Sequence, residues 1–181
     1  GMLRYFGDGF QIAKKFADRR YWRIPVMDGE FVCDHEVGMT RGVGGGNFLI
    51  LAASRPAALA AAERAVAAIR RLPNVILPFP GGVVRSGSKI GSKYKKLVAS
   101  TNDAYCPTLK GETATRLPPD AASVLELVID GLTADDICAA MRAGIVAACA
   151  PGADSGVLRI SAGNYGGKLG QFHFHLRELM G

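Results

Sequence analysis

The fold is decided by residues 47–82, which read NFLILAASRPAALAAAERAVAAIRRLPNVILPFPGG. The apolar run at 47–51 predicts a strand, and a second run at Val75–Leu77 predicts another. Between them, an alanine-rich stretch with few β-branched residues predicts a helix from Pro56 to Leu72. Ser54 is a suitable N-cap, because Pro56 then falls in the first turn. The segment is therefore predicted to be a strand–helix–strand unit.

A second unit of the same kind follows at residues 124–161. Its first strand is Val124–Leu132, its helix starts after the N-cap Thr133, and its last strand is Val157–Ser161. Apolar residues at helical spacing predict the buried faces, which are Leu59, Ala62, Val66 and Ile69 in the first helix and Ile137, Met141, Ile145 and Ala148 in the second. Each unit is long enough for a right-handed crossover.

Two such units predict an α+β fold, namely a ferredoxin-like split βαβ sandwich (βαββαβ) with the helices on one face of a single sheet. An extra N-terminal β-hairpin is predicted where Tyr21–Val26 and Glu30–Cys33 flank a turn at 27–29. We expect two domains, an N-terminal β element at residues 2–46 and a ferredoxin-like lobe at residues 47–181. Residues 83–122 are a long connection of the kind that is usually functional or disordered.

Composition and charge limit the classes of function that fit this chain. The chain has 181 residues, 49% of them hydrophobic, and no apolar run approaches the roughly 18 residues of a membrane span. Its start has no apolar signal-peptide core, so we expect a cytoplasmic protein without membrane contact. A net charge of +6 favours a polyanionic partner, and nucleic acid, an acidic coenzyme and an acidic protein surface all fit.

The four cysteines, Cys33, Cys106, Cys138 and Cys149, form no C-x-x-C pair and have no accompanying histidine cluster. This pattern favours reduced thiols in a cytosolic protein and argues against a zinc site, so we expect no metal. His173 and His175 alternate with phenylalanines, which predicts a terminal surface strand rather than a metal site.

The first candidate binding segment is a basic, glycine-containing loop at 86–96. Its glycines let the backbone approach a ligand, and its hydroxyls and lysines suit carboxylates or phosphates. The candidate residues are Ser86, Ser88, Lys89, Ser92 and Lys93. The spacing is not that of a Walker A loop, and a solvated basic loop without a ligand is the alternative.

A second candidate segment lies at 164–170, where Asn164 and Lys168 could face a ligand. Its glycines follow a predicted strand, so a plain turn or bulge is the alternative.

Glu126 is the third candidate. Strand alternation places Val124, Glu126 and Val128 on one face and Leu125, Leu127 and Ile129 on the other. If protein covers both faces, burial raises the pKa of this carboxyl and keeps it neutral near pH 7. A neutral acid can donate a hydrogen bond to a developing oxyanion. The alternative is a carboxylate on an open sheet face in water.

Several segments together resemble the formylmethanofuran–tetrahydromethanopterin formyltransferase family, over nearly the whole chain. They are Leu3–Phe10, Gly42–Phe48, Pro78–Val84, Ser86–Lys93, Ala99–Asn102, Tyr105–Thr108 and Ile160–Gly170. The resemblance implies transfer of a formyl group from a methanofuran-type amine to N5 of tetrahydromethanopterin. Both coenzymes are polyanionic cosubstrates, and no tightly bound cofactor is implied.

The resemblance also implies site residues and partners. It assigns the active-site glutamate to Glu126 and adds Asn102 to the substrate-binding residues. It implies a homo-oligomer or a subunit of a formyltransferase/hydrolase complex, and it corresponds to the C-terminal (proximal) lobe, with an N-terminal lobe preceding it in the family. A non-catalytic lobe that serves oligomerisation or complex assembly is the alternative. A nucleic-acid-binding domain is disfavoured, because no strand carries the stacking aromatics of that class.

Overall fold

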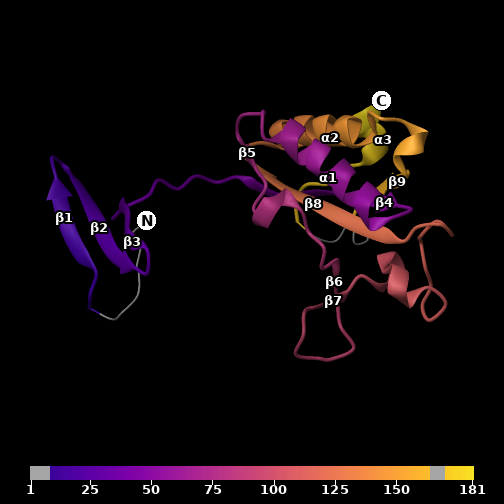
Figure 1. Ribbon diagram of the computed structural model, residues 1–181, viewed down its shortest axis with the longest axis horizontal. Coiled ribbons are helices and arrows are strands. Elements are labelled where there is room, and N and C mark those ends of the chain that lie inside the picture. Colours follow the sequence, from indigo (N-terminus) through magenta and orange to yellow (C-terminus); the bar gives the residue numbers. More distant parts are fainter. Residues whose placement is uncertain (1–8, 164–169) are drawn as a thin grey trace. The chain divides into compact units, whose positions relative to one another are not determined.

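The computed structural model describes residues 9–163 and 170–181, and the chain divides into two compact units, Gly1–Arg41 and Gly42–Gly181 (Figure 1). Among the helices in the described parts of the chain, none is both long and apolar enough to cross a bilayer.

The first unit is a three-stranded antiparallel sheet. Its strands are β1 (Ile12–Phe16), β2 (Arg19–Val26) and β3 (Gly29–Asp34), in the order β1-β2-β3. The β2–β3 pairing confirms the predicted hairpin. Strand β1 adds a third strand to this hairpin, which the sequence did not predict. All five residues of β1 are exposed, and its sequence, IAKKF, does not alternate between apolar and polar residues in the way that predicts a strand.

The second unit is built around a four-stranded sheet. Along the chain it runs β4 (Val43–Ala52), α1 (Arg55–Ile69), β5 (Val75–Ile76), β8 (Ser123–Gly131), α2 (Ala134–Cys149) and β9 (Val157–Ser161). The strand order is β5-β8-β4-β9, and every neighbouring pair is antiparallel. Figure 1 shows α1 and α2 together over one face of this sheet.

Residues 43–46 and 172–176 differ from the prediction. Residues 43–46, which the sequence assigned to the N-terminal element, belong to β4, where a bulge lies between Val43 and Gly46. The predicted terminal strand at 172–176 was also wrong. The chain there is irregular and leads into a short helix, α3 (Leu176–Met180), while Phe174 and Leu176 pack against the core beneath the helices.

The helix starts follow the predicted caps. Ser54 Oγ accepts a hydrogen bond from the backbone N–H of Ala57 at 3.3 Å. Thr133 and Asp136 form a capping box, in which each side chain binds the backbone N–H of the other. Helix α1 ends at Ile69, three residues before the predicted Leu72.

The main core lies between the helices and the sheet. The predicted inner faces are confirmed at all four positions of α2 and at three positions of α1, whereas Leu59 is 48% exposed. The inner face of α1 is largely alanine instead, namely Ala58, Ala61, Ala62 and Ala65 together with Val66 and Ile69. Small side chains let this helix lie close to β4 and β8.

A second, smaller core lies on the other face of the sheet. Leu49 and Leu51 of β4 pack there against Leu117 and Ala121 of the long connection, with Tyr105 beside them. The connection contains a small β6–β7 hairpin (Ser88–Ile90 and Ala99–Thr101) and short 3₁₀ turns at Asp103–Tyr105 and Pro107–Leu109. Further 3₁₀ turns lie at Pro80–Gly82 and Ala153–Ser155. Residues 83–122 therefore cover part of the sheet face opposite the helices.

A candidate acid in a covered cavity

Glu126 lies on the covered face, in the middle of β8. It is directly opposite Leu49 of β4, and both side chains point away from the helices. Only 6% of the residue is exposed, and it is the one buried charged or polar residue found in the described parts of the chain. The open, solvated sheet face that was the alternative for this carboxyl is therefore wrong.

The long connection, residues 83–122, contacts Glu126 through backbone hydrogen bonds. The N–H of Val84 donates to the carbonyl of Glu126 at 2.7 Å, and the N–H of Glu126 donates to the carbonyl of Val84 at 2.9 Å. This isolated bridge continues the edge of β8 beyond the two-residue strand β5. It brings the segment after Val84 over the carboxyl, which is why the side chain loses water.

Burial raises the pKa of the Glu126 carboxyl, and a hydrogen bond from Asn47 partly opposes that rise. Asn47 Nδ2 donates to Glu126 Oε1 at 2.5 Å. Desolvation disfavours the charged form, whereas a donor to the carboxylate favours it. Burial is the larger of the two effects, so the acid keeps its proton to higher pH than an exposed glutamate.

The raised pKa makes stability depend on pH. The unfolded chain releases the Glu126 proton near pH 4.3, whereas the folded chain holds it to higher pH. We therefore expect the free energy of unfolding to fall as pH rises from about 4.3 through the folded pKa. Urea unfolding at a series of pH values, compared with Glu126→Gln, measures this. A difference between the two proteins that stays constant over the whole range would contradict it.

Glu126 opens into a small cavity of about 90 Å³. Its wall comes from β4, β8 and the connection, and the lining residues are Leu49, Val84, Arg85, Ser86, Gly87, Thr101, Asn102, Tyr105, Cys106, Pro107, Val124 and Glu126. The structure thus brings together three residues singled out from the sequence, Glu126, Ser86 and Asn102. A carboxyl that keeps its proton to higher pH at such a wall is better suited to donating a hydrogen bond than an exposed glutamate.

The other candidates from the basic loop lie around neighbouring hollows. Lys89, Ser92 and Lys93 line a hollow of about 690 Å³ formed by the β6–β7 hairpin. A second hollow, of about 640 Å³, joins Lys89 and Asn102 to Arg116. Lys89 also forms an ion pair with Asp103, and this contact lowers the pKa of the Asp103 carboxyl. Its charge is therefore partly compensated within the chain.

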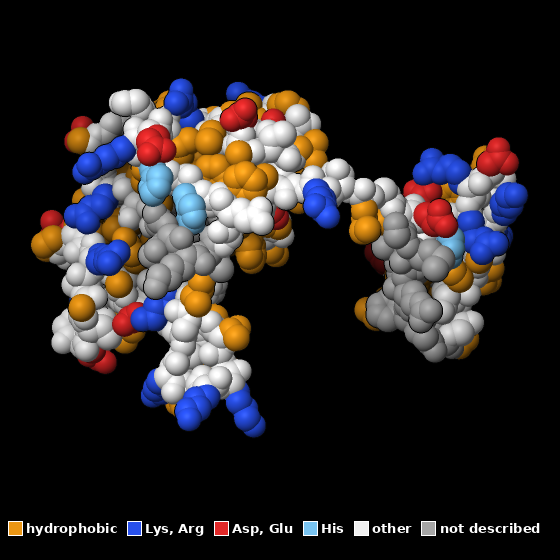
Figure 2. All heavy atoms as spheres, turned by 180° about the vertical axis from the view of Figure 1, so that it is seen from behind, with side chains coloured by type: hydrophobic (Ala, Val, Ile, Leu, Met, Phe, Trp, Pro, Cys, Tyr) orange, Lys and Arg blue, Asp and Glu red, His pale blue; other side chains and the backbone are white. Residues whose placement is uncertain are grey.

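Ser88 lies in β6, directly opposite Thr101, and lines none of these three hollows. Asn164 and Lys168 lie outside the described residues. Figure 2 shows Lys and Arg side chains gathered at the end of a protruding part of the second unit. The loop between β6 and β7 carries exposed lysines at 93, 95 and 96.

Sequence reasoning missed three residues of the cavity region. Asn47 precedes an apolar run and gave no signal of its own as the partner of Glu126. Tyr105 lines the cavity, and its hydroxyl lies 2.9 Å from Ser161 Oγ at the end of β9. Cys106 lines the cavity as well, with its sulfur 3.1 Å from Thr108 Oγ1. The Tyr105–Thr108 segment stood out only through the family resemblance.

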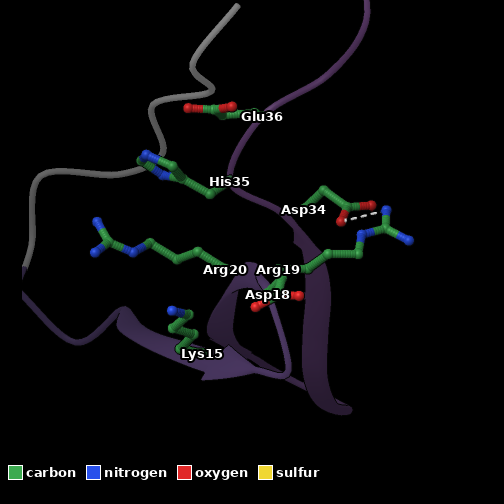
Figure 3. A pocket seen from close by; sticks show the side chains of 7 residues that line it. All are labelled: Lys15, Asp18, Arg19, Arg20, Asp34, His35 and Glu36. Carbon is green, nitrogen blue, oxygen red and sulfur yellow. Dashed lines mark hydrogen bonds and ion pairs between the residues drawn. The ribbon is translucent and has the colours of Figure 1, made fainter.

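The first unit has a hollow of its own, of about 580 Å³ (Figure 3). Three cations, Lys15, Arg19 and Arg20, and three carboxylates, Asp18, Asp34 and Glu36, line it together with His35. Arg19 pairs with Asp34 at 2.7 Å. Since the charges balance, this hollow has no evident preference for an ion of either sign. In the described parts of the chain, no group of three or more His, Cys, Asp or Glu residues could hold a metal ion.

Relatives of known activity match this chain closely. The formylmethanofuran–tetrahydromethanopterin formyltransferase of Methylococcus capsulatus is 71% identical over 98% of this chain and 60% of its own length. A subunit of the formyltransferase/hydrolase complex of Methylorubrum extorquens is 54% identical over 99% of this chain and 60% of its own length. The chain thus spans about 60% of the length of these two curated relatives.

Solved structures agree. A chain of the formyltransferase/hydrolase complex from Methylorubrum extorquens, in complex with methylofuran, matches with a TM-score of 0.76 and 53% identity, over 98% of this chain and 59% of that one. The formylmethanofuran:tetrahydromethanopterin formyltransferase from Methanosarcina barkeri matches with a TM-score of 0.74 and 47% identity, over 95% of this chain and 58% of that one. The family model described as "FTR, proximal lobe" matches residues 29–179, and the chain belongs to that family.

Proposed function

We propose that this chain is the catalytic proximal lobe of an enzyme that moves a formyl group between a methanofuran-type amine and N5 of tetrahydromethanopterin. The observation that carries the proposal is the buried carboxyl of Glu126, which faces a cavity and has a raised pKa. The curated relatives that bear the name of this activity support it.

The reaction exchanges one carbon–nitrogen bond for another. The acceptor nitrogen attacks the formyl carbon, and its bond forms as the carbonyl oxygen takes up negative charge. The intermediate then expels the donor amine, and the proton lost by the acceptor nitrogen ends on that amine. Protonated Glu126 donates a hydrogen bond to the oxygen while it carries the charge. A preorganised donor of this kind is typically worth about 3 kcal/mol.

The acidic coenzymes need cations and polar groups in the cavity wall and around it. We assign this role to Ser86, Ser88, Lys89, Ser92, Lys93, Asn102, Asn164 and Lys168. The hollows beside the cavity support the assignment for Lys89, Ser92, Lys93 and Asn102. The cavity lining supports it for Ser86. Lys93 carries more of the attraction than Lys89, because Asp103 offsets the charge of Lys89. Neither coenzyme is a tightly bound cofactor in this scheme.

The lobe is proposed to work within a homo-oligomer or a formyltransferase/hydrolase complex. The relative from Methylorubrum extorquens, which is named as a subunit of such a complex, supports this. We also propose a ferredoxin-like βαββαβ sandwich for the lobe, supported by the strand order β5-β8-β4-β9. We propose the boundary to the N-terminal β element at 41/42 rather than 46/47, and the division of the chain into two compact units supports this. The four free cysteines support a reducing, cytoplasmic location.

A non-catalytic assembly lobe is the second candidate, and coenzyme binding distinguishes the two. We expect calorimetry on the full-length protein to detect tetrahydromethanopterin binding that weakens severalfold between about 0.05 and 0.5 M salt, because salt screens exposed charges. Lys93→Glu should weaken it further. Lys14→Glu, at an exposed lysine of the first unit, is the matched control and should leave the affinity unchanged. Absence of binding at low salt would favour the assembly role.

A further inference from the structure

Asn47 contacts the candidate acid from the neighbouring strand. It lies opposite Val128, two residues along β8 from Glu126, and its half-buried side chain is on the same face of the sheet. Its Nδ2 donates to Glu126 Oε1 at 2.5 Å. Among the described residues, none donates a hydrogen bond to the other carboxyl oxygen, Oε2.

We propose that Asn47 is a positioning residue that directs the acidic proton of Glu126 onto Oε2, where it is available to the reacting carbonyl. The proposal rests on the function proposed above, in which Glu126 acts as the acid. It concerns which oxygen of that acid carries the hydrogen, and what holds it there.

The reason is the one-way chemistry of the amide nitrogen. The NH₂ group of asparagine only donates, so the oxygen that it binds must accept. A proton on Oε1 would face the N–H of Asn47, whereas a proton on Oε2 leaves both groups satisfied. Without Asn47 the proton is free to sit on either oxygen, and in one of the two arrangements the acid has no hydrogen to offer the substrate.

The same hydrogen bond limits how far burial raises the pKa of Glu126. Removing it should let the carboxyl hold its proton to still higher pH. Other charged or titratable groups face the same cavity, namely Arg85, Tyr105 and Cys106 of the connection. They are unchanged in an Asn47 variant, so a shift between the two proteins reports the Asn47 contact.

The test compares rate and pH profile in the full-length protein. For Asn47→Leu we expect kcat to fall about 10- to 100-fold, the range known for residues that orient metal ligands. The fall in rate at high pH, where Glu126 loses its proton, should move to higher pH. Asn47→Asp has nearly the shape of asparagine but lacks the donor, and it should move this fall at least as far. Val128→Ala, the neighbour on the same face, is the control and should leave it in place.

Carbon-13 NMR of the Glu126 carboxyl gives the same pH shift without an activity assay. An unmoved or lowered midpoint in both Asn47 variants would overturn the proposal. Glu126→Gln separates this outcome from failure of the proposed function. If that variant keeps the high-pH fall, another group is responsible and the function assigned to Glu126 is wrong. If it loses the fall while the Asn47 variants do not shift it, only the positioning role is wrong.

Discussion

Replacing Glu126 with leucine is expected to slow formyl transfer by about 100- to 1,000-fold, the usual loss when one donor to an oxyanion is removed. Leucine is similar in size to glutamate and should fill the buried position without opening a large cavity. It has no hydrogen to donate, so the charge on the carbonyl oxygen loses its partner. The loss should appear in kcat of the full-length protein, measured at saturating concentrations of both coenzymes.

Two further variants test whether the loss of rate comes from the missing hydrogen-bond donor at position 126. Glu126→Gln keeps an oxygen that accepts from Asn47 and an N–H that can donate, so it should lose less activity than Glu126→Leu. Glu63→Gln removes an exposed acid of α1 and should leave the rate unchanged. A Glu126→Leu protein that is folded and transfers formyl groups at the original rate would remove Glu126 from the mechanism.

Local sequence signals predicted the scaffold that holds this acid. Alternation along β8 assigned Glu126 to the face opposite Leu127, and the structure confirms this assignment. The caps Ser54 and Thr133 fixed where the helices begin. These features depend on residues within a few positions of one another, so a single sequence is enough to predict them.

The cover over the acid could not be predicted in this way. It depends on one isolated backbone bridge at Val84 and on Leu117 and Ala121, which lie in a connection without strand or helix periodicity. Asn47 is 79 positions from Glu126, and no local pattern links the two residues. Whether Glu126 was shielded therefore depended on long-range contacts that only the structure supplies.

Replacing Leu51 with alanine is expected to cost about 2–5 kcal/mol of unfolding free energy, the usual range for a fully buried leucine. Leu51 belongs to the smaller core under the connection, so the substitution weakens the packing that holds residues 83–122 on the sheet. Urea unfolding measures the global cost. Hydrogen exchange at the amides of Val84 and Ala122, which bond to β8 and β4, should accelerate more than exchange in α1 and α2.

Leu127→Ala is the matched comparison, because Leu127 is also fully buried but packs in the core beneath the helices. Both variants remove the same side-chain atoms, so their global costs should be similar. Only Leu51→Ala should lower the pKa of Glu126 toward its ordinary value, because water then reaches the carboxyl more often.

Equal acceleration of exchange at Val84 in both variants would show that the connection opens only with the whole lobe. In that case the shielding of Glu126 would depend on global stability and not on the smaller core. If instead the two variants differ as expected, the small core controls the acid strength of the site independently of the core that holds the lobe together.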